Sequence, residues 1–212
     1  AQVSKINAAA IQLGELNWRN PDSLDRHFWT QIQQFPEVSA IEFGNAQTGA
    51  GHGVRHLKER SLAISAADVT TSKAQIFYAA GDRGQRGKVL SATPNFDARQ
   101  RPWYQVAVSA GKLTWTEPFH TFTTKQLSLS AVQPVYEPST GKLVGVVAAS
   151  CLLDRIGNFL RTLKLGRSGK LFIVERSGEL IATSSNEPSF TINGKQIERV
   201  AAIASKEPAI RA

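Results

Sequence analysis

The most constraining feature of this sequence is a pair of long segments with strand-like composition, separated by a turn of only four residues. The segments are QLSLSAVQPVYE at residues 126–137 and KLVGVVAASCLL at residues 142–153, and PSTG at 138–141 joins them. Valine, leucine and alternating small residues favour strands, whereas proline, serine and glycine together favour a tight turn. Because so short a turn connects antiparallel strands, these residues predict a long β-hairpin and an antiparallel sheet.

Further strand-like segments precede this hairpin and alternate with turns. The expected strands are VSAIEFGN (38–45), SLAISAADV (61–69), KAQIFYAA (73–80), KVLSAT (88–93) and KLTWTEPF (112–119). The glycine-rich QTGAGHG (47–53) lacks the lysine and the following helix of a phosphate-binding loop, so we interpret it as a hairpin turn. This order predicts a sheet built largely as an antiparallel meander.

Helical periodicity appears in five other segments. Residues 1–18 carry an apolar stripe, formed by Val3, Ile6, Ala10 and Leu13, of the narrow kind that coiled coils use. The other helices are expected at residues 21–35, 98–110, 154–164 and 195–205. The sequence therefore predicts an α+β fold.

The order of elements restarts after residue 150, which predicts two modules. We expect an N-terminal stalk helix and a following helix at residues 1–36, a full module at 37–152, and a partial module at 153–212. Two strands and two helices would leave a sheet edge and one sheet face uncovered, so the second module is expected to be incomplete. The chain contains no methionine and begins at Ala1, which suggests a fragment of a longer protein.

Composition and charge limit the class of protein but do not identify its function. Hydrophobic residues make up 42% of the chain, an ordinary share for a globular protein with a real core. The net charge of +8 favours anionic partners, but no run of five or six like charges occurs. The single cysteine, Cys151, excludes an intrachain disulfide, and no apolar stretch approaches the length of a membrane span.

The segment FDARQRPWYQVA, at residues 96–107, brings together three charged side chains, a proline and the large aromatic residues Trp103 and Tyr104. Pro102 suits the first turn of a helix, and a helix N-terminus favours anions. Arg101 would add a planar five-donor group suited to a carboxylate, with Trp103 and Tyr104 as walls of a pocket. The alternative is that Trp103 belongs to the core, that Arg101 pairs with Asp97, and that nothing binds.

Other functions have weaker support in the residues. His52 and His56 are four residues apart, but their segment is glycine-rich and lacks a zinc-site pattern, so neither a metal nor another cofactor is expected. No nucleophile motif or pair of catalytic acids is recognisable, so the chain is not expected to be an enzyme. Trp103, Tyr104 and Trp115 could stack bases, but lysine and arginine gather on no single element, so nucleic-acid binding is not expected.

Several motifs together resemble the double Cache (dCache) sensor domains of bacterial transmembrane receptors. The resemblance rests on FDARQRPWYQVAVSAGKLTWTEPF (96–119), LSAVQPVYEPSTGKLVGVVAAS (129–150) and LDRIGNFLRTLKLGRSGKLFIVERSGELIATS (153–184), in that order, and spans nearly the whole chain. It implies two tandem PAS-like modules behind a long N-terminal helix. The first module would be membrane-distal and ligand-binding, and the second membrane-proximal.

The resemblance also implies site residues. Arg101, Trp103 and Tyr104 match the pattern with which many amino-acid-binding members hold the ligand carboxylate. The tyrosine and two aspartates that hold the ligand amine in those members correspond to Phe119, Thr121 and a position near Ser150, none of which is acidic. A buried ammonium would then lack a counter-charge. We therefore expect a small anion, a carboxylate without an amine, or another polar metabolite, in a pocket that is also lined by Phe77 or Tyr78, Phe119, Thr121 and Ser150.

The sequence leads to one hypothesis and one alternative. The hypothesis is an extracytoplasmic (periplasmic) ligand-sensing fragment of a membrane-anchored signal-transduction receptor, with a histidine kinase or a nucleotide cyclase as its output domain. It would bind its ligand in the distal module and form a homodimer through the N-terminal helix. The alternative is a structural spacer of such a receptor that dimerises and binds no ligand.

Overall fold

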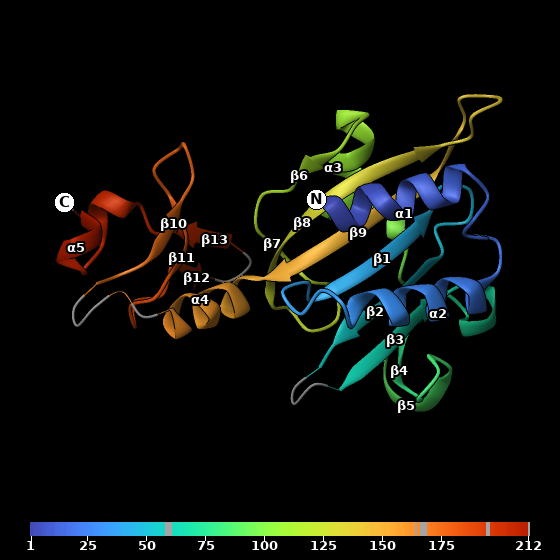
Figure 1. Cartoon of the computed structure of the whole chain (residues 1–212), viewed down its shortest axis with the longest axis horizontal. Helices are drawn as coiled ribbons and strands as arrows, with labels where there is room; N and C mark the ends of the chain where they lie inside the picture. Colours follow the sequence, from blue (N-terminus) through green and yellow to red (C-terminus); the bar gives the residue numbers. More distant parts are fainter. Residues whose placement is uncertain (58–60, 164, 166–168, 194–195, 212) are drawn as a thin grey trace. The chain divides into compact units, whose positions relative to one another are not determined.

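The computed structural model describes residues 1–57, 61–163, 165, 169–193 and 196–211 (Figure 1). The chain divides into two compact units, Ala1–Cys151 and Leu152–Ala212. This division lies beside residue 152, where the sequence predicted a change of module. Each unit is described separately below.

A large sheet forms the centre of the first unit. Its strands follow the order β5-β4-β3-β2-β1-β9-β8-β6, and β7 pairs with β8. The strands are β1 (Ala40–Asn45), β2 (Gly51–His56), β3 (Leu62–Ala67), β4 (Gln75–Ala80), β5 (Arg86–Thr93), β6 (Thr114–Trp115), β7 (Phe119–His120), β8 (Leu127–Tyr136) and β9 (Leu143–Leu152). β1 to β5 pair in sequence as an antiparallel meander, and β9 returns to pair antiparallel with β1. The expected α+β fold with an antiparallel sheet is therefore confirmed.

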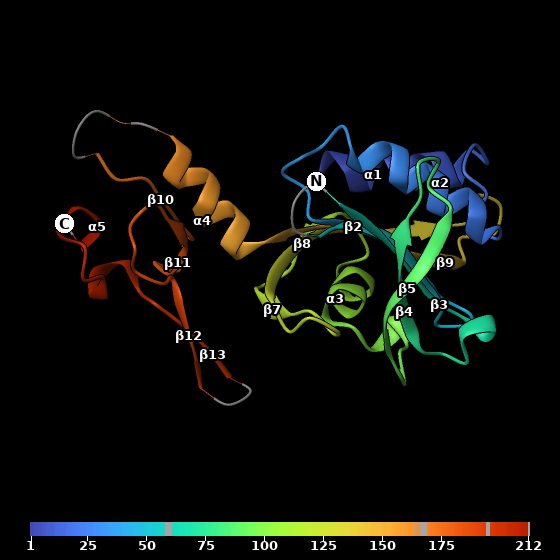
Figure 2. The same ribbon diagram turned by 90° about the horizontal axis from the view of Figure 1, so that it is seen from below.

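Helices cover both faces of this sheet (Figure 2). On one face lie α1 (Gln2–Gln12) and α2 (Pro21–Ile32), which pack on Ile41 and Phe43 of β1. On the other face, η3 (Ala98–Gln100) and α3 (Pro102–Ala110) pack on Val146 and Ala148 of β9. Because side chains alternate along a strand, β9 serves both cores at once, with Val147 and Ala149 in the first and Val146 and Ala148 in the second.

The first helix is shorter than predicted, and its buried face differs from the expected stripe. It ends at Gln12, just before Gly14, whose φ of 77° lies in the left-handed region. The residues of α1 that are buried against the sheet are Val3, Ser4, Asn7, Ala8 and Ile11. Ile6 and Leu13, which belong to the predicted stripe, are 42% and 73% exposed. Of the predicted stripe, Val3 is therefore in the core, whereas Ile6 and Leu13 are at the surface.

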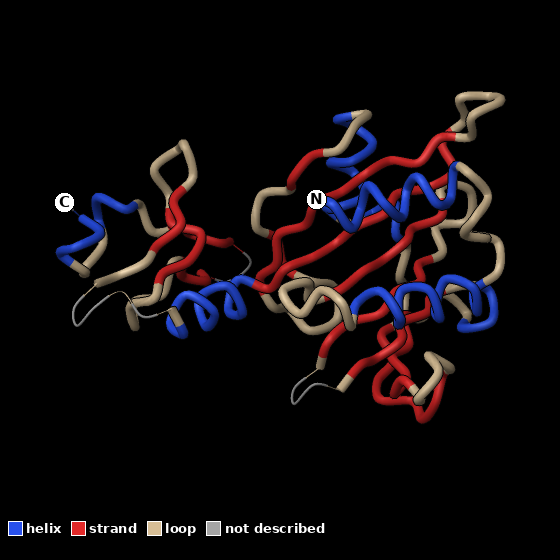
Figure 3. Tube along the Cα trace, in the orientation of Figure 1, coloured by secondary structure: helices blue, strands red, loops and turns tan. Residues whose placement is uncertain are grey.

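The second unit contains short elements. They are α4 (Leu153–Thr162), β10 (Phe172–Val174), β11 (Leu180–Thr183), β12 (Phe190–Asn193), β13 (Gln196–Arg199), η4 (Ala202–Ala204) and α5 (Pro208–Arg211) (Figure 3). The helix predicted at residues 195–205 is wrong, because 196–199 form a strand that pairs with β12. In the sequence, the β-branched residues Thr191, Ile192 and Ile197 favour strands over a helix. Residues 194 and 195 lie outside the described part.

Within the described residues, no helix is both long enough and apolar enough to cross a membrane.

Candidate functional site

The candidate site is built on the face of the sheet that α3 covers. Asp97 begins η3 by accepting a hydrogen bond from the backbone N–H of Arg99, and Arg101 then stands at the N-cap of α3. Pro102 follows as the first helical residue, where its missing N–H costs nothing. This local sequence therefore fixes Arg101 at the start of a helix, as the sequence predicted.

The guanidinium of Arg101 has no carboxylate partner among the described residues. Its Nε donates to the backbone carbonyl of Asp97 at 3.1 Å, while the Asp97 side chain pairs with Arg99 instead, at 2.7 Å. The guanidinium carbon lies 4.4 Å from the centre of the Phe122 ring and 5.7 Å from that of Phe96. Partial burial lowers the pKa of Arg101, and the nearby Asp97 partly opposes this shift. The charge of Arg101 is thus held against aromatic rings, and its terminal nitrogens bond to none of the described residues.

Trp103 and Tyr104 are core residues of the first unit. They are 5% and 4% exposed, and their ring centres are 5.7 Å apart in an edge-on arrangement. Both rings lie so close to Gly44 of β1 that a Cβ there would fall 2.8 Å from Trp103 and 3.0 Å from Tyr104. Burial raises the pKa of the Tyr104 hydroxyl. These two side chains anchor the helix that carries Arg101.

Three further predicted positions have different environments. Phe119 of β7 is half-buried and packs on the core that contains Trp103. The Thr121 hydroxyl is within hydrogen-bonding distance of the Thr124 hydroxyl, at 2.8 Å, and accepts a hydrogen bond from a backbone N–H of the same turn. Ser150 of β9 is buried, and its hydroxyl lies 2.7 Å from that of Ser130 on β8. Thr121 and Ser150 thus already have hydrogen-bond partners within the protein.

The pairing register separates the two alternatives Phe77 and Tyr78. Phe77 is buried and lies opposite Ser65 of β3, in the row of residues that continues through Gly53 to Glu42. Tyr78 lies opposite Ile64, whose side chain belongs to the core beneath α1 and α2. Adjacent residues of a strand point to opposite faces. Only Phe77 shares the face of the candidate site, and we remove Tyr78 from it.

Two charged residues on this face were missed by the sequence analysis. Glu42 of β1 and Arg55 of β2 lie on the same face as Phe77, and the Arg55 guanidinium carbon is 5.3 Å from the Phe77 ring centre. Burial raises the pKa of Glu42 and lowers that of Arg55, and each opposes the shift of the other. Glu42 makes no hydrogen bond or ion pair to any described residue. A single charged residue in the strand segment VSAIEFGN was the available signal.

The residues therefore assemble into a face with charges of both signs. Arg101 and Arg55 provide cationic groups, Glu42 provides a carboxylate, and Phe77 and Phe122 provide apolar surface. Gln75 of β4 accepts a hydrogen bond from the hydroxyl of Thr123, at 2.6 Å, which ties the turn after β7 to this face. In the described residues, no group of three or more His, Cys, Asp and Glu is placed to hold a metal ion.

The fold and this face define a class of protein. An antiparallel sheet with N-terminal helices on one face, and polar groups facing a helix-and-turn cover on the other, is the PAS-like architecture of sensor modules. The family model for the Cache domain, dCache_1, matches residues 30–207. The chain belongs to this Cache family, as its motifs indicated.

Curated relatives of the chain are chemotaxis receptors. It is 29% identical over 92 residues to the methyl-accepting chemotaxis protein McpA of Pseudomonas putida, covering 43% of this chain and 14% of McpA. It is 32% identical over 104 residues to PctB of Pseudomonas aeruginosa, covering 46% of this chain and 16% of PctB. The chain thus spans a small part of the relatives it matches. Their names describe receptors, in agreement with the expectation that this chain is not an enzyme.

Solved structures share the fold at low sequence identity. The ligand-binding domain of the Pseudomonas aeruginosa amino acid chemoreceptor PctC, in complex with GABA, matches with a TM-score of 0.54 and 19% identity over 85% of this chain and 66% of that one. The domain of the Pseudomonas fluorescens chemoreceptor CtaA with L-valine has a TM-score of 0.51 and 20% identity, covering 85% and 63%. The extracellular domain of the putative histidine kinase mmHK1S-Z3 has a TM-score of 0.52 and 12% identity, covering 85% and 62%.

Proposed function

We propose that this chain is the extracytoplasmic ligand-sensing part of a membrane-anchored bacterial receptor, and that Arg101 binds an anionic group of the ligand. The observation that carries the proposal is the half-buried guanidinium of Arg101 at the N-terminus of α3, without a carboxylate partner in the described residues. A guanidinium forms strong bidentate hydrogen bonds with a carboxylate, and the helix N-terminus adds a favourable dipole. Trp103 and Tyr104 position this group from the core.

The ligand class follows from the charges on the same face. The sequence argued against an amine because Phe119, Thr121 and Ser150 carry no acid. Glu42 supplies a carboxylate from β1 instead, and its raised pKa reflects the cost of burying it, which the attraction of Arg55 offsets only in part. We therefore widen the proposed ligand from an amine-free carboxylate to any small carboxylate, including one that carries an ammonium. GABA and L-valine, named with the PctC and CtaA structures, belong to this wider class.

The type of receptor is also part of the proposal. The sequence analysis expected a histidine kinase or a nucleotide cyclase, but the curated sequence relatives are methyl-accepting chemotaxis proteins. The likeness to a histidine kinase domain concerns the fold alone. We therefore favour a chemoreceptor. Ligand binding would act by favouring one of two arrangements of the receptor, which requires a higher affinity for that arrangement.

One observation supports the alternative of a structural spacer. Trp103 and Tyr104 are explained by core packing, so two of the three matched motif residues require no ligand. Ile6 and Leu13 on α1 are exposed apolar side chains, as a helix that pairs with a second copy would present. Dimerisation through α1 remains a prediction that sensor and spacer share, so it does not discriminate between them. Binding of a small molecule does.

The test is a thermal-shift screen with small carboxylates, matched amines and amino acids. A ligand present at 100 times its Kd stabilises the folded state by about 2.7 kcal/mol, which raises the melting temperature of a chain of this size by about 5–10 °C. We expect hits among carboxylates that disappear in Arg101→Ala but persist in Arg83→Ala, a control on an exposed turn. Hits that persist unchanged in Arg101→Ala would refute its role, and a flat screen of the folded protein would favour the spacer.

A further inference from the structure

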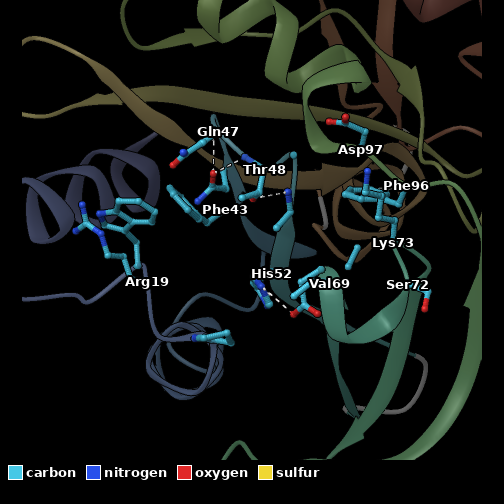
Figure 4. A pocket seen from close by; sticks show the side chains of 17 residues that line it. Arg19, Phe43, Gln47, Thr48, His52, Val69, Ser72, Lys73, Phe96 and Asp97 are labelled. Carbon is cyan, nitrogen blue, oxygen red and sulfur yellow. Dashed lines mark hydrogen bonds and ion pairs between the residues drawn. The ribbon is translucent and has the colours of Figure 1, made fainter.

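A separate cavity lies in the first unit at the ends of β1, β2 and β3 (Figure 4). The connection between α1 and α2, the β1–β2 turn, the segment after β3 and the segment before η3 border this half-open cavity, and its volume is about 620 Å³. This volume is typical of sites that bind small organic molecules. None of the predicted site residues lines it.

Aromatic side chains provide the apolar wall of the cavity. Phe43 of β1 and Phe96 before η3 are 1% and 6% exposed, and Trp18 lies with its ring centre 6.0 Å from that of Phe43. Phe43 and Phe96 are almost fully covered by protein and form the base of the cavity, so the apolar surface that a ligand can reach comes mainly from the partly buried Trp18 and the exposed Val69. The cavity therefore suits a ligand with an apolar body.

The acidic groups that face this cavity already have partners. Asp68 accepts hydrogen bonds from the backbone and the hydroxyl of Thr70, and its second oxygen lies 3.4 Å from the ring of the buried His52. Asp97 is paired with Arg99 through several hydrogen bonds, and this pairing lowers the pKa of Asp97. Neither carboxylate is left to neutralise a cation in the cavity.

The basic groups that line the cavity form no ion pair with a described residue, although the charge of Lys73 contributes to the lowered pKa of Asp97. The Arg19 guanidinium lies 4.1 Å from the centre of the Trp18 ring, and neither Arg19 nor Lys73 forms an ion pair with any residue that the structure describes. Figure 4 shows Arg19 and Lys73 on opposite sides of the cavity. Asn45 uses its side-chain oxygen to hold the β1–β2 turn, which leaves its amide N–H groups as donors. The available polar groups are therefore mainly cations and N–H donors.

We propose that this cavity is a second binding site, and that it takes an organic carboxylate with an apolar body. The site is distinct from that of Arg101, although the two share a wall. Arg101 lies over the ring of Phe96 at 5.7 Å and donates to the carbonyl of Asp97, and both of these residues also line the cavity.

The test uses two probes of equal body and opposite charge, phenylacetate and phenethylamine. Both are titrated against the Arg101→Ala variant, so that binding at Arg101 cannot contribute, and binding is followed by ligand-observed NMR or calorimetry. We expect phenylacetate to bind and phenethylamine to bind much more weakly. Equal binding of the two, stronger binding of the amine, or no binding of phenylacetate at millimolar concentration would overturn the proposal.

Variants of the wall locate the binding. When added to the Arg101→Ala variant, Lys73→Ala and Arg19→Ala should each raise the Kd of phenylacetate by about twofold to fivefold, as expected for the loss of a partly exposed ion pair. Ala50→Leu should abolish binding by filling the cavity, provided that its melting temperature shows a folded protein. Lys88→Ala, an exposed lysine on β5, is the matched control and should leave binding unchanged. Binding that survives all three wall variants places phenylacetate elsewhere and refutes the site.

Discussion

A buried charge network beneath α2 should give this protein an unusual dependence of stability on pH. Asp25 of α2 pairs with Arg86 of β5, from Oδ2 to Nε, at 2.7 Å. Arg86 also approaches Nδ1 of His52, at 3.3 Å, and the other ring nitrogen of His52 faces Asp68 at 3.4 Å. Asp25 and His52 are both buried, and Oδ1 of Asp25 has no hydrogen-bond partner in the part of the chain that the structure describes. The pKa of Asp25 is raised and that of His52 is lowered, so the two groups affect stability in opposite ways as the pH changes.

Burial raises the pKa of Asp25 from 3.8 to about 6, although Arg86 opposes the shift. Between these two pH values the folded protein keeps a proton that the unfolded chain has released. The stabilisation from this proton is therefore complete below pH 3.8 and is lost as the pH rises through about 6. At about 1.4 kcal/mol per pKa unit, the change is about 3 kcal/mol.

Burial lowers the pKa of His52 from 6.5 to about 4, against the attraction of Asp68, and Arg86 adds to the shift. Between these values the unfolded chain binds a proton that the folded protein excludes. The contribution of His52 is therefore complete above pH 6.5 and is lost as the pH falls to about 4. It is also about 3 kcal/mol and has the opposite slope. Between pH 4 and 6 the two contributions should nearly cancel.

Substituting Asp25 or His52 alone should reveal the pH dependence of stability that the other residue contributes. We expect Asp25→Asn to lose about 3 kcal/mol of unfolding free energy, relative to the wild type, as the pH falls from 6 to 4. His52→Gln should gain a similar amount over the same interval, and Asp82→Asn, an exposed acid, should run parallel to the wild type. Urea denaturation at half-unit steps of pH measures all four proteins. An Asp25→Asn curve parallel to the wild type would refute a buried, proton-binding Asp25.

Two further predictions concern stability alone. Gly44→Ala should lower the unfolding free energy by about 1–3 kcal/mol, because the added Cβ would lie 2.8 Å from Ala98 and Trp103. Gly157→Ala in α4, where the added Cβ would make only ordinary contacts, should raise the unfolding free energy by about 0.4–1 kcal/mol. Calorimetric melting of both variants tests this contrast, and equal shifts of the melting temperature would contradict it. Asn20→Ala should cost about 1 kcal/mol, because Asn20 caps α2 by accepting two backbone N–H groups, and urea denaturation would show no change if the cap were unimportant.

The sequence predicted those features that depend on local patterns. The β8–β9 hairpin, the strands β1, β3, β4 and β5 of the meander, and the position of Arg101 at a helix start follow from turn residues, strand periodicity and Pro102, whereas β2 (Gly51–His56) was not predicted because its first residues were interpreted as a turn. Features that depend on the pairing register could not be predicted. Which of Phe77 and Tyr78 shares a face with Arg101 depends on the register of β3 and β4, and so does the row that joins Phe77 to Glu42. A shift by one residue would exchange the two faces.

The register also explains the glycines of the β1–β2 hairpin, which the sequence analysis interpreted only as a turn. A Cβ at Gly49 would lie within 2.4–2.8 Å of the Asp97 carboxylate, and one at Gly51 would lie 2.6 Å from the Phe96 ring. Because Gly49, Gly51 and Gly44, which lies against Trp103, have no side chains, the segment that leads into α3 can pack closely on these strands. The glycine-rich hairpin is therefore the surface on which residues 96–104 pack. Phe96 borders both sites, since Arg101 lies 5.7 Å from its ring centre and the same residue lines the cavity, so substitutions in this hairpin should disturb both sites together.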